Sequence, residues 1–161
     1  MTRQITALLL CNLLIGTVAL LSKNVNAQTA TSPAPPRLAF HDHLPATPLP
    51  DTLDPAQFLK NRPAFVAYFL AAQSKETLYQ VPCYCHCNRE RGHQSLLDCF
   101  ADKHGAQCVI CQKEAIFCWS QKKKGKNPAE IREAMAKGKA LRIDLSKYTD
   151  RFFSARKDLQ R

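Results

Sequence analysis

Glycine and the motifs that depend on it are scarce in this chain. Only five of the 161 residues are glycine, and no glycine-rich loop of the kind that cradles phosphates is present. Paired catalytic carboxylates and a Ser-His-Asp pattern are also missing, so the sequence gives no support for a hydrolase. The low glycine content excludes collagen-like sequence, and a 45% share of hydrophobic residues excludes a wholly disordered chain. A small globular protein remains, and its length favours one folded domain.

Only one long apolar run occurs, near the N-terminus. It covers residues 5–21, follows the positive charge of Arg3 and precedes small residues that end at Ala27. This pattern is typical of a secretory signal peptide, so we expect residues 1–27 to be removed by cleavage. An uncleaved membrane anchor is the alternative, although the run is at the lower limit for spanning a bilayer. We expect a mature chain without a stable membrane span, exported to the periplasm or the extracellular space, where conditions are oxidising.

Charge is distributed unevenly along the rest of the chain. Residues 28–118 hold eight basic and eight acidic side chains, whereas residues 119–161 hold thirteen basic and five acidic ones. The peak of positive charge, Lys122 to Lys126, has no interleaved aromatic residues, so we expect no nucleic-acid partner. A solvated helix end explains these lysines better, because cations are favourable at the negative end of a helix dipole.

The mature chain divides into three parts by composition. Six prolines fall within residues 28–53, which predicts a proline-rich linker. Residues 54–150 are predicted to form a cysteine-rich helical domain, and residues 151–161 a polar basic tail.

Helix start signals recur through the predicted domain. Asp54 before Pro55 and Asn127 before Pro128 each combine an N-cap with a proline at the first helical position. Apolar spacing and further caps predict helices at 64–73, from Ser95 through Phe100, at 107–123 and from Asn127 to Gly138. The alternation of Leu141, Ile143 and Leu145 predicts one short extended segment. The expected fold is mainly α, a small helical domain built around a Cys/His-rich loop.

Cysteine is the unusual ingredient of the predicted domain. Seven cysteines lie between Cys83 and Cys118, and an odd number cannot be fully paired within one chain. Three histidines, His86, His93 and His104, lie among them. We expect a metal site, or two adjacent sites, formed by Cys83, Cys85, Cys87, His93, Cys99, His104, Cys108 and Cys111.

The spacing of these residues suits metal chelation. If the segment 83–87 is extended, Cys83 and Cys87 share one side and Cys85 faces away, so the loop can wrap around one ion or bridge two. Cys108 and Cys111 form a Cys-x-x-Cys pair at the start of a helix, with both sulfurs on one face. Thiolate and imidazole ligands select Cu(I) or Zn(II) over Mg²⁺ or Ca²⁺.

Two other functions stay open beside metal binding. The Cys-x-x-Cys pair also suits a thiol-disulfide oxidoreductase, although no βαβ pattern precedes it. A disulfide-stapled interaction domain fits an exported location. We favour sequestration or delivery of Cu(I) or Zn(II) over catalysis and assign no catalytic residue. The expected partners are the metal ion and a metal-transfer or redox protein.

The motifs around these cysteines resemble a known family. The segments are PCYCHC at 82–87, GHQS at 92–95, DCF at 98–100, HG at 104–105 and CVIC at 108–111. They are similar to exported bacterial proteins and lipoproteins named for a PCYCGC motif, also called the CYCXC family of (seleno)proteins, over roughly residues 64–148. Some members carry selenocysteine in place of a cysteine, which implies a reactive chalcogen and supports the redox alternative. His86 stands where the family has glycine, and Cys118 is an additional thiol; the roles of both stay open.

Overall fold

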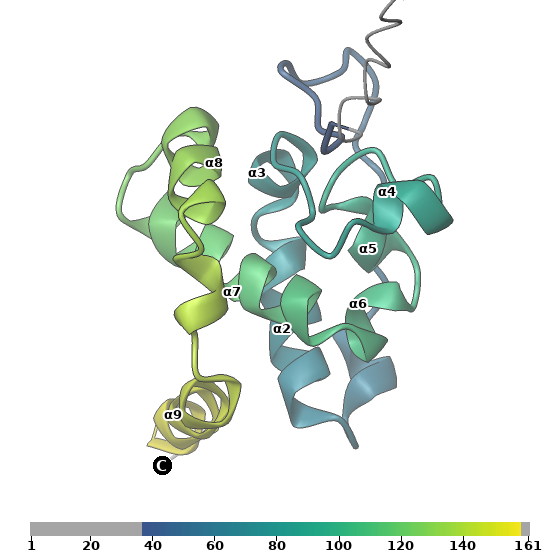
Figure 1. The fold of residues 1–161 in the computed structure, drawn as a ribbon. Coiled ribbons are helices and arrows are strands. Elements are labelled where there is room, and N and C mark those ends of the chain that lie inside the picture. Colours follow the sequence, from purple (N-terminus) through teal and green to yellow (C-terminus); the bar gives the residue numbers. More distant parts are fainter. Residues whose placement is uncertain (1–36, 159–161) are drawn as a thin grey trace, which may run out of the picture. The chain divides into compact units, whose positions relative to one another are not determined.

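A computed structural model describes residues 37–158 (Figure 1). Within this range the chain forms eight α-helices and two 3-10 helices and no β-strand, which confirms a mainly α fold. The predicted signal peptide (1–27), the first part of the predicted linker (28–36) and residues 159–161 of the predicted tail lie outside the described residues. Among the described residues, no helix has both the length and the apolar character needed to cross a membrane.

The helices are short, and three of those nearest the cysteines have only four residues each. In chain order they are η1 (Pro55–Phe58), α2 (Arg62–Ala72), α3 (Lys75–Tyr79), α4 (Cys87–Glu90), α5 (Asp98–Ala101), α6 (His104–Gln107), α7 (Val109–Lys123), α8 (Pro128–Ala136), η2 (Ala140–Arg142) and α9 (Leu145–Asp158).

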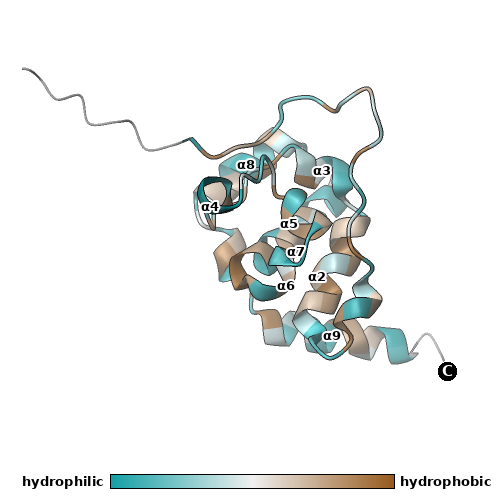
Figure 2. Ribbon diagram, turned by 90° about the vertical axis from the view of Figure 1, so that its right-hand side faces the viewer, coloured by the Kyte–Doolittle hydropathy of each residue, from teal (hydrophilic) through white to brown (hydrophobic). Residues whose placement is uncertain are grey.

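The core is formed by α2 and α7, which pack against each other and contact most of the remaining elements (Figure 1). Helix α2 is largely apolar, whereas α4 is hydrophilic (Figure 2). Tyr68 of α2 is fully buried, and its hydroxyl donates a hydrogen bond of 2.6 Å to the carbonyl of Asp102. The same buried cluster includes Cys83, Cys99 and Cys111. The hydrophobic core therefore continues without a break into the cysteine-rich region.

Several helix boundaries follow the sequence signals. The Asp54 side chain accepts a hydrogen bond from the backbone of Ala56 at the start of η1. Asn127 and Glu130 form a complete capping box on α8, and Gly138 follows this helix with a φ of 70°. These starts and this stop confirm the expectations from local capping chemistry.

Other boundaries differ from expectation. The short helix expected from Ser95 begins later, as α5, because the Asp98 carboxylate binds the backbone amides of Gln94 and Ser95 and holds that segment in a turn. The helix expected at 107–123 is interrupted at Cys108, which has an extended conformation between α6 and α7.

The prediction of a short extended segment at residues 141–145 is wrong. Residues 140–142 form η2, and α9 starts at Leu145 with the Asp144 side chain accepting a hydrogen bond from the backbone of Lys147. Phe152 of α9 packs on Phe69 of α2 at a ring-centroid distance of 5.4 Å. Aromatic packing at helical spacing along α9 outweighs the brief alternation that precedes it.

Candidate metal centre

The first three cysteines lie in a tight turn that leads into α4. Cys83 and Cys87 are buried and Cys85 is half-buried. His86 adopts a left-handed conformation with φ 63° and ψ 25°, directly before α4. The segment is therefore not extended, and the expectation that Cys85 faces away from its neighbours is wrong: the Sγ atoms of Cys83 and Cys85 lie 3.2 Å apart. The turn directs all three sulfurs toward one another.

Helices α5 and α6 bring the next two predicted ligands to this turn. Cys99 of α5 is fully buried, with its Sγ 3.4 Å from that of Cys87. His104 begins α6, and its Nε2 lies 3.3 Å from Cys85 Sγ. Gly105 permits this close packing, because a Cβ there would lie 2.8 Å from the carbonyl oxygen of Cys99. The small residue next to His104 is thus what allows α6 to approach α5.

The remaining cysteines enter from the start of α7. Cys108 stands at the N-cap position and is half-buried, and Cys111 lies within the first turn and is fully buried. The Cys111 sulfur lies 3.4 Å from that of Cys83 and 3.7 Å from that of Cys85. The Cys-x-x-Cys pair therefore faces the Cys-x-Cys-x-Cys turn across the site.

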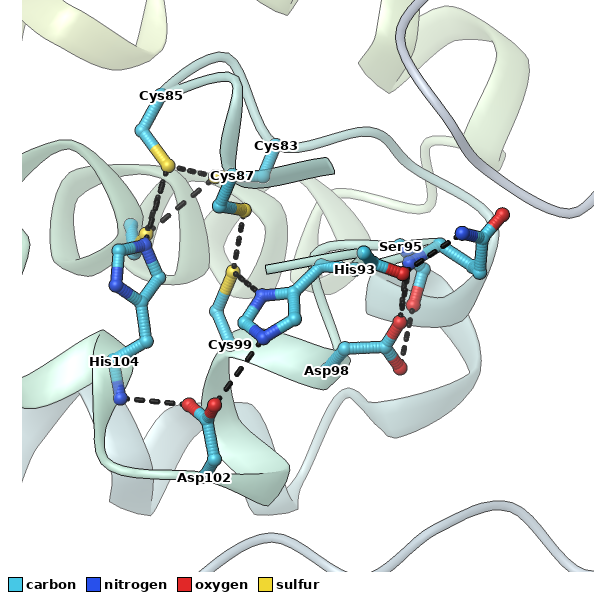
Figure 3. Close-up of polar contacts among 12 residues, drawn as sticks. Cys83, Cys85, Cys87, His93, Ser95, Asp98, Cys99, Asp102 and His104 are labelled. Carbon is cyan, nitrogen blue, oxygen red and sulfur yellow. Dashed lines mark hydrogen bonds and ion pairs between the residues drawn. The ribbon is translucent and has the colours of Figure 1, made fainter. Parts of the chain in front are cut away.

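His93 reaches the cluster from the loop between α4 and α5 (Figure 3). Its Nδ1 lies 3.3 Å from Cys99 Sγ, while its Nε2 lies 3.2 Å from the Asp102 carboxylate. The second oxygen of Asp102 accepts a hydrogen bond of 2.7 Å from the backbone amide of His104. Asp102 thereby holds His93 with Nδ1 directed at the sulfurs, an arrangement common among histidines that bind metals.

Together these elements gather all eight residues that the sequence singled out. Six cysteines and His104 fall into overlapping groups whose donor atoms lie within 4.8 Å of one another, and His93 adjoins Cys99. A tetrahedral ion with metal–sulfur bonds of about 2.3 Å separates its sulfurs by about 3.8 Å. The sulfur contacts of 3.2 to 3.7 Å are close to that value, and all seven described cysteines carry free thiols. The cluster can hold a metal ion.

Comparison with known proteins agrees with the motif. A family model described as a protein of unknown function with PCYCGC motif matches residues 46–140. The chain belongs to this PCYCGC family. No curated protein and no solved structure matches it.

The structure explains the glycine in the PCYCGC motif. His86 occupies that position, and its positive φ is a conformation that glycine adopts without steric cost. The His86 side chain is exposed and belongs to none of the potential ligand groups in the described residues. Cys118, the additional thiol, is fully buried away from the cluster, with its sulfur 3.6 Å from that of Met135.

Charge within the cluster is shared among neighbouring thiols. Hydrogen bonds from adjacent thiols, above all Cys108, hold the pKa of Cys85 well below its ordinary value. The pKa of Cys83 is raised, chiefly by its hydrogen bond with Cys111. Burial opposes protonation of His104, but its hydrogen bond with Cys85 and the charges of the nearby cysteines together outweigh burial and raise the pKa of the imidazole. The metal-free site therefore combines thiolates with thiols that a metal must deprotonate.

Two carboxylates beside the cluster are less evident from sequence. Glu114 lies one turn after Cys111 and is only 1% exposed, and its carboxylate accepts a 3.0 Å hydrogen bond from the backbone amide of Tyr84. Burial raises the pKa of Glu114 to about 8. Asp102 was not singled out, although its position three residues after Cys99 and two before His104 was an available signal.

Proposed function

We propose that this PCYCGC protein is an exported soft-metal-binding protein that sequesters or delivers Cu(I) or Zn(II). The convergence of six thiols and two imidazoles supports this function more than any other observation. Thiolate donors favour Cu(I), and mixed sulfur and nitrogen donors at tetrahedral spacing suit Zn(II).

The donor residues differ in how deeply they are buried, which supports delivery of a metal ion as well as its storage. Cys85, Cys108 and His104 are partly exposed, whereas Cys83, Cys87, Cys99 and Cys111 are buried. Exposed thiolates can exchange an ion with a partner protein, and buried ones protect it from water and oxidants. More donors are present than one ion needs, so ligands can be exchanged during transfer.

Metal binding by the reduced, anaerobic chain tests this function. We expect Cu(I) and Zn(II) each to bind with high affinity in competition with a chromophoric chelator. Cys111→Ser should weaken the binding of at least one ion by more than about 100-fold, exceeding the effect typical of losing a group outside the ligand set. Cys118→Ser is the matched control, because it removes another buried α7 thiol that lies outside the cluster. Failure of the unmodified chain to bind either ion would reject the function.

Export needs a separate experiment. We expect the expressed chain to be recovered outside the cytoplasm with Gln28 as its first residue, because the apolar run and the small residues before Ala27 match a cleaved signal. N-terminal sequencing after cell fractionation measures this. A chain that keeps its first 27 residues and stays with the membrane would indicate the anchor alternative.

The closeness of Cys83 and Cys85 also supports a second function, thiol-disulfide exchange. The Cys85 thiolate would attack a substrate disulfide, and a second thiol, Cys83, would release the product. Two electrons would pass from the protein to the substrate, with one proton from Cys83 and one from water, giving two substrate thiols while the protein gains one disulfide. Turnover of a disulfide substrate by the metal-free chain, lost in Cys85→Ser, would support this function. Equal turnover by both chains would exclude Cys85 as the attacking thiol.

A further inference from the structure

The eight donors can be assigned to two adjoining sets of four, which meet where Cys83 Sγ lies 3.2 Å from Cys85 Sγ and 3.4 Å from Cys111 Sγ. In the first set, the donor atoms of Cys85, His104, Cys108 and Cys111 all lie within 4.8 Å of one another. In the second set, Cys83, Cys87 and Cys99 are within the same limit in every pair, and His93 adds its Nδ1 at 3.3 Å from Cys99. Each set contains three sulfurs and one nitrogen, the number and the kinds of donor atom that a tetrahedral ion takes.

The two sets also differ in burial. Three of the four residues in the first set are partly exposed, whereas all three cysteines of the second are buried and the His93 side chain is only 10% exposed. We call them the outer centre (Cys85, His104, Cys108, Cys111) and the inner centre (Cys83, Cys87, Cys99, His93). Figure 3 shows His104 beside Cys85 of the outer centre and His93 beside Cys99 of the inner one.

We propose that the chain binds two ions, one in each centre, and that the outer ion exchanges with the surroundings while the inner ion is retained. This inference rests on the proposed metal-binding function. The sulfurs of Cys83 and Cys111 lie 3.4 Å apart and join the centres, and Asp102 contacts a histidine of each. Occupation of one centre therefore positions ligands of the other.

Zinc titration of the full chain, reduced and held without oxygen, tests the proposal. Native mass spectrometry should detect two Zn(II) ions. A chromophoric chelator should then remove one ion at least 10-fold faster than the other. Cys108→Ser should leave one slowly released ion, because it opens only the outer centre. Cys87→Ser should leave one rapidly released ion.

Controls separate this proposal from a folding defect and from the broader function. Cys118→Ser should keep both ions and both rates. If Cys87→Ser loses helical circular dichroism, His93→Ala replaces it, since His93 lies at the edge of the inner centre. A single bound ion, equal release rates, or loss of both ions in every ligand variant would reject two separate centres while leaving metal binding intact. A chain that binds no ion would reject the proposed function as well.

Discussion

At the residue scale, Asp102 holds the ring of His93, one of the predicted ligands, through its contact with Nε2. Asp102→Asn exchanges a carboxylate that can accept from His93 Nε2 for an amide that can turn either an oxygen or a nitrogen toward the ring. We expect the affinity of the inner centre for Zn(II) to fall by about 10- to 100-fold, the usual effect of losing such a partner. Competition titration that resolves the two ions measures this.

The matched control for Asp102 is Asp98 of α5, a carboxylate whose partners are the backbone amides of Gln94 and Ser95 and the Ser95 hydroxyl. Asp98 accepts hydrogen bonds from the amides of Gln94 and Ser95, so Asp98→Asn changes the local turn without contacting a ligand side chain. We expect both ions to keep their relative affinities in that variant. Equal losses in the two variants would indicate that Asp102 acts only on fold stability.

Glu114 makes the stability of the metal-free chain depend on pH. Burial raises the pKa of Glu114 from 4.5 to about 8, so between these values the folded chain holds a proton that the unfolded chain has released. The free energy of unfolding therefore falls as pH rises through this range. Glu114→Gln has no carboxyl group to titrate, so its free energy of unfolding should lack this part of the fall. Between pH 5 and pH 8, the stability of the variant relative to the unmodified chain should rise by on the order of a few kcal/mol, at about 1.4 kcal/mol for each pKa unit.

Urea denaturation of the reduced, metal-free chains at pH 5 and pH 8 measures the effect of Glu114. Glu133→Gln is the control, because the Glu133 side chain is exposed and pairs only with Lys137. The prediction fails if the unfolding free energies of Glu114→Gln and the unmodified chain change in parallel with pH.

The sequence predicted which cysteines and histidines gather in the cluster, but not the carboxylates that support them. Cys and His at short spacing are recognisable because few other roles need so many of them together. Asp102 and Glu114 lack such a signal, since most carboxylates are solvated, and their roles depend on which backbone amides and rings the fold places beside them.

At the element scale, the turn before α4 contains a strained residue. In the left-handed conformation of His86, the Cβ atom lies unfavourably close to the backbone, a conflict that glycine avoids because it has no Cβ. His86→Gly should stabilise the fold by about 0.5–1 kcal/mol, because the greater freedom of glycine in the unfolded chain offsets part of the relief. Thermal denaturation measures this gain.

His86→Ala is the comparison for this turn. Alanine keeps a Cβ and hence the strain, so we expect no such gain, and neither variant should change metal affinity. Loss of metal affinity in both variants would show that the imidazole is a ligand.

Local signals predicted the helices that carry strong caps and missed those that depend on contacts. Asn127 with Pro128 and Glu130 defines α8 from neighbouring residues alone. The interruption at Cys108 and the turn at Cys85 depend instead on packing between α5, α6 and α7. The predicted boundaries of the signal peptide, linker, domain and tail stay predictions.

At the scale of the whole molecule, metal binding should determine thermal stability. An ion that binds only the folded chain stabilises it by about 4 kcal/mol at 1,000 times its Kd. We expect Zn(II) to raise the Tm of the reduced chain by roughly 10 °C or more. Differential scanning calorimetry with Zn(II), and with Mg²⁺ as the control ion, measures this. A similar rise in a chain that carries both Cys87→Ser and Cys108→Ser would mean that the stabilising ion binds outside the cluster.

The three four-residue helices around the cluster have a consequence for how the site is assembled. Helices α4, α5 and α6 are far shorter than a helix that persists alone in water. They are held by the core, in which Phe100 and Tyr68 pack edge to face at 4.9 Å. A synthetic peptide covering residues 83–111 would keep every ligand and lose the scaffold that aims them. That short stretch contains all the predicted ligands, but their arrangement in space depends on the folding of the whole domain.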